Sequence, residues 1–295
     1  MSGICEGRVV IVTGSGGGLG AAHARTLASE GARVVVNDIN LEAAQKVVAD
    51  IVESGGHAII NDSDITNYAD SQRAVAEAVE AFGGLHGVVN NAGVNRDRMF
   101  ASMTEHEWDT IMAVHLKGHF CITSHAVQYW RQQSKIGAPV SGRIVNTTSG
   151  AGLQGSIGQA NYAAAKAGIA ALTLNQAAEL ARYGITANAI APVARTGMTT
   201  AVPEMAARMA PPSDGGFDVF APENVSSLVV WLCSESSGSF TGRILESEGG
   251  RLCIADGWRT TPGIDKGSRW APSEIGAAID ELLRSEMPAQ KVWGA

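Results

Sequence analysis

A tyrosine and a lysine stand four residues apart in the stretch QANYAAAKAG, residues 159–168, as Tyr162 and Lys166. Residues at this spacing share a face of a helix, so the two side chains can meet. An ammonium beside a phenol favours the phenolate and would lower the tyrosine pKa from its usual value of about 10. The pair could therefore supply a general base at neutral pH, although the same spacing also suits simple packing.

A glycine-rich turn, TGSGGGLG at residues 13–20, follows the first apolar run of the chain. Such a tight turn needs positive φ, and the missing side chains let backbone amides at a helix N-terminus approach a pyrophosphate. A plain loop is the alternative, but the position between a strand and a helix favours dinucleotide binding. The candidate cofactor-binding residues here are Gly14, Gly16, Gly18, Leu19 and Gly20.

The second apolar run, ARVVVND, ends at Asp38, 24 residues after Gly14. A carboxylate at this point can accept hydrogen bonds from the hydroxyls of the adenosine ribose, and it would repel a 2′-phosphate. Its other interpretation is a cap for the helix expected to begin near Leu41. The turn holds no Arg or Lys that could bind a 2′-phosphate, so the sequence predicts NAD rather than NADP.

Short apolar runs alternate with stretches of helical period along the whole chain. The expected strands cover residues 8–14, 32–38, 57–62, 85–91, 142–149, 185–192 and 242–247, and the expected helices cover 18–30, 41–54, 67–82, 105–133, 158–183 and 222–235. Continuous apolar runs indicate strands that are buried on both faces of a parallel sheet. The sequence therefore predicts an α/β fold: a single doubly wound parallel-sheet domain of the Rossmann type, with helices on both faces.

We expect this catalytic domain to cover residues 1–250, with residues 193–221 as a substrate lid or as simple loop core. Residues 251–295 would form a C-terminal extension that packs on the domain or on a partner subunit. The extension contains one amphipathic helix near 273–287, closed by Pro288. The apolar face of that helix consists of Ile275, Ile279, Leu282 and Leu283.

The composition excludes several classes of protein. A net charge of −7 without a basic cluster argues against a nucleic-acid partner. The four cysteines form no CxxC pair, and the histidines show no metal-ligand spacing, so no metal is expected and the thiols indicate a cytoplasmic protein. No apolar run reaches the ~18–20 residues that a membrane span needs.

Four motifs together resemble the short-chain dehydrogenase/reductase family over roughly residues 5–250. They are TGSGGGLG, NNAG at 90–93, Ser149, and YAAAK at 162–166, with the serine 13 residues before the tyrosine. The resemblance implies that Tyr162 takes the proton of an alcohol while hydride leaves for the nicotinamide. Ser149 would hold the substrate oxygen, and Lys166 would also bind the nicotinamide ribose.

The same resemblance assigns further contacts with the cofactor. Asp64 would bind the adenine amino group with the backbone at Ile65 beside it, although Asp64 could instead begin the helix at 67–82. Asn90 and Ala92 would border the adenosine ribose. Thr196 would reach the carboxamide of the nicotinamide, although Val193 stands where the family usually has glycine.

His115, in IMAVHLKGHF, stands where the family usually has asparagine. With VVNNAGVNRDRMF and GQANYAAAKAG, this histidine is similar to the (3R)-hydroxyacyl-CoA dehydrogenase part of the peroxisomal multifunctional enzymes. The likeness implies a 3-hydroxyacyl-CoA substrate and a place for His115 in a proton relay. A buried histidine bonded to a carbonyl is the alternative for His115.

Two other functions compete with this one. The chain could be a hydroxysteroid or other alcohol dehydrogenase of the same family, or a non-enzymatic NAD-binding regulator, although a pure binder has no need of a phenolate. In each case we expect a homotetramer built partly from the helices at 105–133 and 158–183, since the second offers small residues nearly all round.

Overall fold

The computed structural model describes residues 3–200, 203–255, 257, 263–284 and 292–293. In this part of the chain eight strands form one sheet in the order β3-β2-β1-β4-β5-β6-β7-β8. The strands are β1 (Val9–Thr13), β2 (Arg33–Asn37), β3 (His57–Asn61), β4 (Gly87–Asn90), β5 (Gly142–Thr147), β6 (Ile185–Val193), β7 (Ile244–Glu248) and β8 (Arg251–Ala255). Strands β1 to β7 are parallel, so the predicted doubly wound α/β fold is confirmed.

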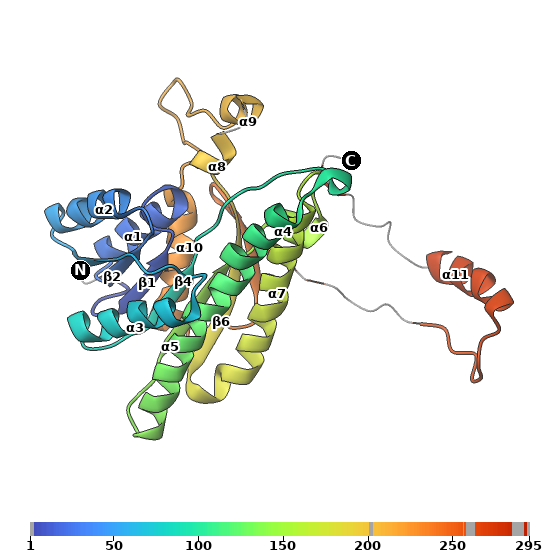
Figure 1. Ribbon diagram of the computed structural model, residues 1–295, viewed down its shortest axis with the longest axis horizontal. Coiled ribbons are helices and arrows are strands. Elements are labelled where there is room, and N and C mark those ends of the chain that lie inside the picture. Colours follow the sequence, from blue (N-terminus) through green and yellow to red (C-terminus); the bar gives the residue numbers. More distant parts are fainter. Residues whose placement is uncertain (1–2, 201–202, 256, 258–262, 285–291, 294–295) are drawn as a thin grey trace.

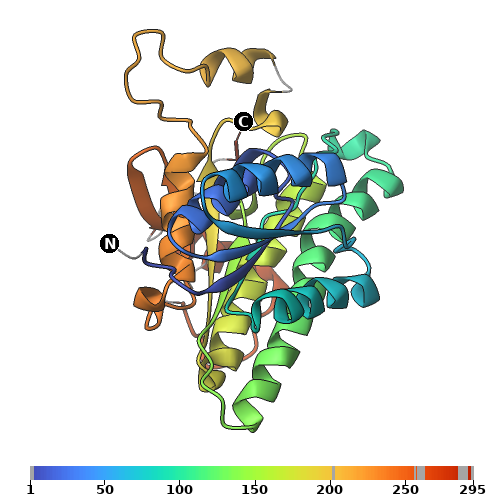
Figure 2. The same ribbon diagram turned by 90° about the vertical axis from the view of Figure 1, so that its left-hand side faces the viewer.

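Helices cover both faces of this sheet (Figures 1 and 2). One face carries α1 (Gly18–Ser29), α2 (Leu41–Glu53) and α10 (Glu223–Cys233), and the other carries α3 (Tyr68–Phe82), α5 (Gly118–Lys135) and α7 (Ala160–Leu180). Strand β1 shows why both faces are covered: Val10 and Val12 belong to one core, and Val9 and Ile11 belong to the other. Successive side chains of a strand point to opposite faces, so a continuous apolar strand needs a helical layer on each side.

The expected helix at 105–133 is continuous but not uniform. It consists of α4 (Glu105–Ile111), a π-helical segment η2 (Met112–Lys117) and then α5. Thr104 begins it with a capping box, because its hydroxyl accepts from the Glu107 N–H while the Glu107 carboxylate accepts from the Thr104 N–H. A π-helical segment changes which side chains face inward, and such segments are frequent at functional sites. His115 lies in this one.

Strand β8 was not predicted. It pairs antiparallel with β7 through a turn at Gly249 and Gly250, and Gly249 has a φ of +53°. The two glycines between apolar runs are a hairpin signal that could have revealed it. The strand is at the edge of the sheet and leaves Leu252 and Ile254 more than half exposed, which is why its sequence lacks the usual appearance of a buried strand.

The remaining described elements lie at the carboxyl edge of the sheet, in connections and in the tail. They are η1 (Phe100–Ser102), α6 (Gly150–Gln154), η3 (Ala181–Tyr183), α8 (Gly197–Thr200), α9 (Pro203–Arg208), η4 (Glu235–Ser237), η5 (Pro272–Glu274) and α11 (Ile275–Arg284). Helices α8 and α9 protrude from one end of the sheet, and α11 lies apart from the body (Figures 1 and 2). The predicted end of the tail helix at 287 and Pro288 lie outside the described residues. None of the described helices is long and apolar enough to cross a membrane.

Candidate active site

The glycine turn joins β1 to α1, as predicted. Gly14 and Gly18 have φ values of +62° and +52°, which favour glycine. A Cβ on Gly14 would lie 2.6 Å from the Ala92 Cα, and one on Gly20 would lie 2.3 Å from the Gly14 carbonyl oxygen. The turn is therefore packed against the NNAG loop by its own backbone. Glycine at positions 18 and 20 leaves the N-terminus of α1 with few side chains, a cradle that fits a pyrophosphate.

Asp38 follows β2 and faces the glycine turn. One carboxylate oxygen accepts from the Gly16 N–H at 2.9 Å, and the other accepts from the Asn40 N–H at 2.9 Å. Helix α2 is capped by Asn40, whose side chain accepts from the Ala43 N–H. Asp38 is thus not the helix cap, and its carboxylate is held beside the turn where a ribose would lie.

Asp64 and Ile65 follow β3 at the same edge of the sheet. The Asp64 carboxylate accepts from the Thr66 N–H and hydroxyl, both at 2.8 Å, and the residue remains exposed. Helix α3 is capped by Asn67, so Asp64 does not take the capping role either. Ile65 is buried. The Asp64 side chain is therefore available to a ligand at the surface.

Asn90 is the last residue of β4, at the carboxyl end of the strand. Its side chain is fully buried, and it donates to the Thr123 hydroxyl at 2.8 Å and to the Asn146 carboxamide oxygen at 2.9 Å. These bonds connect β4 to β5 and α5 and keep the side chain inside the sheet. The expected contact of Asn90 with the ribose would therefore be made by its main chain, and it stays a prediction. Ala92 does contact the glycine turn.

Ser149, Tyr162 and Lys166 come together at the carboxyl end of β5. Ser149 begins α6 and accepts from the Ala151 N–H at 3.2 Å, while the other two residues lie on one face of α7. The side chains of Ser149 and Tyr162 are hydrogen-bonded through their hydroxyls. The Lys166 Nζ is 5.4 Å from the centre of the Tyr162 ring. The sequence spacing thus gives one cluster with a hydroxyl, a phenol and an amine.

Burial decides the charges in this cluster. It raises the pKa of Tyr162, and the hydrogen bond with Ser149 lowers that pKa only in part. Lys166 is almost fully buried, and burial lowers its pKa to about 7 while its Nζ donates to the Thr147 carbonyl at 2.6 Å. In the protein without cofactor, burial therefore outweighs whatever lowers the Tyr162 pKa. The expected phenolate, which a bound positively charged nicotinamide would also favour, stays a prediction.

The His115 ring contacts the Tyr162 ring edge to face, and the ring centres are 5.2 Å apart. Its Nε2 is 2.8 Å from the Val94 carbonyl oxygen and 3.1 Å from the Val94 nitrogen. Burial and the positive charge of Lys166 lower its pKa to about 3, so the ring is neutral. A Cβ on Gly93 would lie 2.5 Å from the His115 Cε1, which explains why glycine is required there.

Thr196 lies near the start of the segment 193–221, the proposed lid, and beside the glycine turn. Its side chain is 3.6 Å from the position a Gly18 Cβ would occupy, and its N–H donates to the Thr199 hydroxyl at 2.8 Å. The lid is fastened just before it. The Arg195 N–H donates to the Phe220 carbonyl at 2.7 Å, and the Arg195 guanidinium pairs with the Asp218 carboxylate. The two ends of the lid therefore meet at this ion pair.

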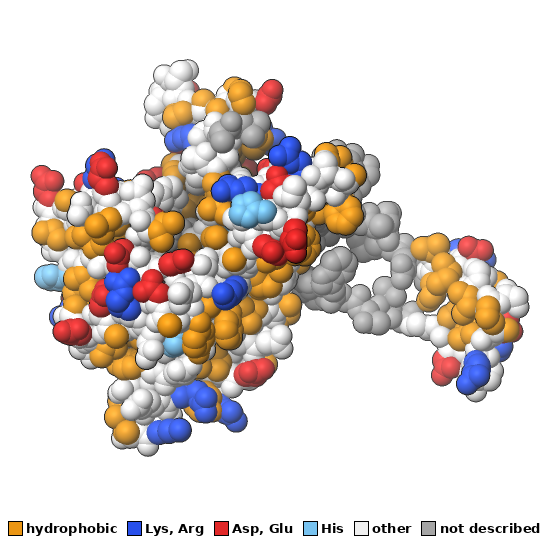
Figure 3. Space-filling view, in the orientation of Figure 1, with side chains coloured by type: hydrophobic (Ala, Val, Ile, Leu, Met, Phe, Trp, Pro, Cys, Tyr) orange, Lys and Arg blue, Asp and Glu red, His pale blue; other side chains and the backbone are white. Residues whose placement is uncertain are grey.

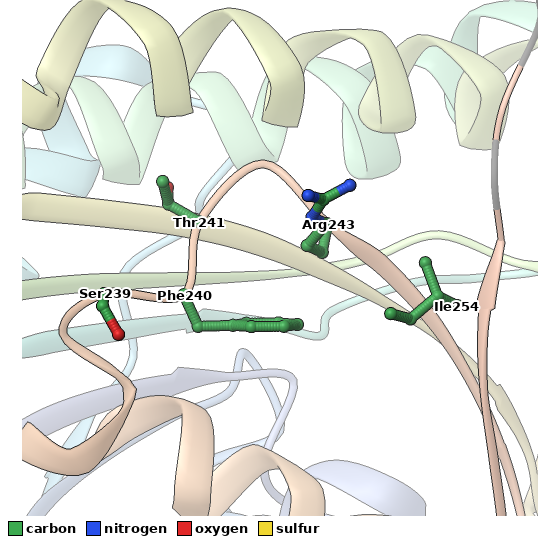
Figure 4. Close-up of a pocket in the computed structure, with 5 residues that line it drawn as sticks. All are labelled: Ser239, Phe240, Thr241, Arg243 and Ile254. Atoms are coloured by element: carbon green, nitrogen blue, oxygen red, sulfur yellow. The ribbon is translucent and has the colours of Figure 1, made fainter.

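A surface hollow elsewhere does not belong to this site. It is lined by Ser239, Phe240, Thr241, Arg243 and Ile254 (Figure 4). Arg243 precedes β7, whereas the candidate site residues follow the ends of their strands. The hollow is thus at the opposite edge of the sheet. Within the described residues, no group of three or more His, Cys, Asp or Glu side chains could hold a metal ion.

The carboxyl end of the chain also reaches the site, which the sequence did not predict. The Ile157 N–H donates to the Trp293 carbonyl at 3.0 Å, and the Trp293 N–H donates to the Gly155 carbonyl at 3.3 Å. The loop that receives these bonds follows Ser149 by a few residues. A contact between residues so far apart in the chain leaves no local pattern that could reveal it.

A family profile described as short chain dehydrogenase matches residues 8–207. With the turn, the sheet and the Ser149–Tyr162–Lys166 cluster in place, the chain belongs to the short-chain dehydrogenase family, and it is an oxidoreductase acting on CH–OH groups. The predicted family is therefore confirmed. Members of this family generally use NAD or NADP.

The chain is similar to several named proteins. It is 41% identical to "Hydroxyacyl-CoA dehydrogenase ChsB1" of Mycobacterium tuberculosis, over 97% of this chain and 91% of that protein. It is 39% identical to mouse "Peroxisomal multifunctional enzyme type 2" over 86% of this chain, but that match covers only 32% of the longer enzyme. A short chain dehydrogenase crystal structure from Mycobacterium avium shares 52% identity, with a TM-score of 0.91 over 99% of this chain and 100% of that one.

Proposed function

We propose that this oxidoreductase is NAD-dependent and transfers hydride between nicotinamide and the secondary alcohol of a 3-hydroxyacyl-CoA. The observation that carries the chemistry is the cluster of Ser149, Tyr162 and Lys166 at the carboxyl end of β5. The substrate class is supported by the relative named hydroxyacyl-CoA dehydrogenase, which matches nearly the whole chain. Breakdown of a lipid or a steroid side chain is the corresponding role.

Each residue of the cluster has a distinct task in this proposal. Tyr162 accepts the hydroxyl proton of the alcohol as general base, and Ser149 holds the substrate oxygen and the Tyr162 hydroxyl in one hydrogen-bonded set. Lys166, fixed by the Thr147 carbonyl, orients the ribose beside the nicotinamide. A bound NAD supplies the hydride acceptor and a positively charged ring. His115 packs on Tyr162. Its Nε2 faces Val94, so its Nδ1 would take part in the proposed proton relay.

The preference for NAD follows from Asp38. Its carboxylate is held by two backbone N–H groups and faces the turn, so a 2′-phosphate at the ribose would meet a fixed negative charge. The pyrophosphate would lie on Gly16, Gly18, Leu19 and Gly20. Ala92 and the Asn90 main chain would border the adenosine.

The two ends of the cofactor have their own proposed partners. Asp64, exposed after β3, would accept from the adenine amino group with the Ile65 backbone beside it. Thr196, next to Gly18, would bind the nicotinamide carboxamide. These two assignments place the ends of the dinucleotide on opposite sides of the glycine turn.

We assign the substrate lid to residues 193–221. Met198, Phe217 and Val219 are exposed on it, with Phe217 64% exposed, whereas Met209 is buried and anchors it. Apolar side chains that face solvent near a catalytic cluster suit a long acyl chain or a ring system. The ion pair between Arg195 and Asp218 joins the two ends of the lid, so the lid would move as one unit.

We infer that the protein is a homotetramer built partly on α5 and α7. Helix α7 exposes a stripe of small and apolar residues at helical spacing, Ala164, Ala167, Ala171, Leu174 and Ala178. Phe120 of α5 is 51% exposed, and hydrophobic side chains gather over both helices (Figure 3). Helix α11 also exposes Ile275, Ile279 and Leu283, so we assign this helix of the C-terminal extension to contact with a partner subunit.

A hydroxysteroid dehydrogenase is the second candidate, favoured by the same exposed apolar lid. A turnover screen decides between the two. Purified protein is supplied with NAD and a matched series of 3-hydroxyacyl-CoA esters and free hydroxysteroids. We expect long or bulky CoA esters to exceed free alcohols by at least ~100-fold in kcat/KM, about 2.7 kcal/mol. Equal turnover of a free hydroxysteroid would promote the alternative.

A further inference from the structure

The carboxyl end of the chain packs on the segment that directly follows Ser149. Trp293 forms a parallel bridge with Ser156, and the paired main chains exchange the two hydrogen bonds with Gly155 and Ile157. The paired loop directly follows α6, the short helix that begins right after Ser149. The chain end is thus connected by backbone bonds to the segment that carries the substrate-binding hydroxyl.

The indole of Trp293 lies against the start of that segment. Its Cη2 and Cζ2 atoms are 3.3 and 3.4 Å from the position that a Cβ on Gly150 would occupy. Val292 is similarly 3.3 Å from the Cβ position of Gly155. Glycine at both positions therefore lets the chain end approach the loop closely. Trp293 is nevertheless 51% exposed, so half of a large apolar surface still faces out.

The other side of the loop is built in the same way. Arg98 forms a parallel bridge with Gln159, and the Met99 sulfur is 3.9 Å from the Cβ position of Gly158. Met99 and Ile157 are also about half exposed. Half-exposed apolar side chains therefore flank both sides of the loop that follows α6. Exposed apolar patches with polar groups at their centre are typical of ligand grooves.

We propose that Trp293 is a specificity-determining residue of the substrate site, which binds the acyl or ring-bearing part of the substrate against its exposed indole face. This inference rests on the proposed function for the class of substrate. An aromatic ring offers a large rigid apolar surface, and its burial by a long or bulky substrate removes that surface from water. A short substrate would not reach it.

Trp293→Ala and Trp293→Leu test the proposal, with Trp270→Ala as the matched control in the same C-terminal extension. The measured quantity is a selectivity ratio: kcat/KM for the best bulky substrate divided by kcat/KM for its shortest analogue. We expect the ratio to fall at least tenfold in Trp293→Ala, about 1.4 kcal/mol, and less in Trp293→Leu. The control should stay within twofold of the parent, and the Kd for NAD should be unchanged in all variants.

The outcomes separate this inference from the proposed function. If the parent prefers free hydroxysteroids, the proposed substrate class fails, but the ratio is still measured with the preferred class. If Trp293→Ala and Trp293→Leu lower kcat/KM equally for short and bulky substrates, Trp293 only supports the loop and the inference is overturned. The two variants are measured side by side, so that poor folding of one leaves the other to decide.

Discussion

The proposed cofactor half and the proposed substrate half of this molecule present different kinds of surface. In the first half, the glycine turn packs on Ala92 by backbone contact, and the Asp38 carboxylate is already held by two N–H groups. In the second half, Phe217 of the lid and Trp293 of the chain end expose large apolar surfaces. The cofactor would therefore bind to polar groups that are already held in place. The substrate would instead cover apolar side chains that are exposed without it.

The largest expected effect lies where the two halves meet. Tyr162→Phe should lower kcat by a factor of ~10²–10⁴ or more, because it removes the general base while leaving the ring in contact with His115. The Kd for NAD should stay within a few-fold of the parent, since the glycine turn and Asp38 are untouched. Steady-state kinetics and a cofactor titration measure both. A variant that keeps a tenth of the parental kcat would show that Tyr162 is not the base.

Asp38→Ala tests the polar groups of the cofactor half alone. We expect the parent to prefer NAD over NADP by a factor of ~30–150, about 2–3 kcal/mol, because a 2′-phosphate meets the fixed carboxylate. The variant should lose most of this preference and keep its discrimination among substrates. Glu53→Ala, which removes an exposed carboxylate at the end of α2, is the control. Equal kcat/KM with the two cofactors in the parent would contradict the assignment.

Arg195→Gln probes the substrate half alone. It breaks the ion pair with Asp218 that joins the two ends of the lid. We expect KM for a bulky substrate to rise about three- to tenfold, with little change in the Kd for NAD. Arg208→Gln removes an exposed charge from the same lid and should have no such effect. If Arg195→Gln keeps the parental KM, the ion pair between Arg195 and Asp218 does not control substrate binding by the lid.

The oligomer prediction concerns the surface outside both halves. Leu174→Glu places a charge in the exposed stripe of α7 and should prevent close helix packing across a two-fold axis. Light scattering should then fall from about four chain masses toward the 30.6 kDa of one chain. Glu179→Gln, an exposed position near the end of the same helix, serves as the control. A parent protein that is monomeric at micromolar concentration would refute the tetramer.

The smallest effect concerns pH. Burial raises the pKa of Tyr162, so little phenolate exists near neutrality and alcohol oxidation should speed up from about pH 7 to about pH 9. The pKa of His115 is about 3, so His115 stays neutral over this range and cannot cause that rise. His115→Asn should therefore keep the same rising limb, with kcat within about tenfold of the parent. If the rise in rate with pH disappears in His115→Asn, His115 is the titrating group.

Local patterns in the sequence were enough for most of the fold. Continuous apolar runs predicted strands β1 to β7, because strands buried on both faces need no alternation. The turn at residues 13–20 and the Tyr162–Lys166 spacing were equally local, since positive φ and a shared helix face depend on neighbours in the chain. Strand β8 was missed although its Gly249–Gly250 turn was visible, because an exposed edge strand resembles a loop.

Tertiary structure decided what depends on burial and on distant contacts. The sequence gives the phenol and the amine their spacing, but the enclosing core raises the pKa of Tyr162 and lowers that of Lys166 to about 7. Whether Asn90 faces a nucleotide or the sheet depended on Thr123 and Asn146, which no spacing rule connects to it. Likewise, Trp293 reaches the loop after Ser149 only because the folded chain returns there. Desolvation and long-range contact are properties of the packed molecule, whereas turn geometry and periodicity belong to the chain itself.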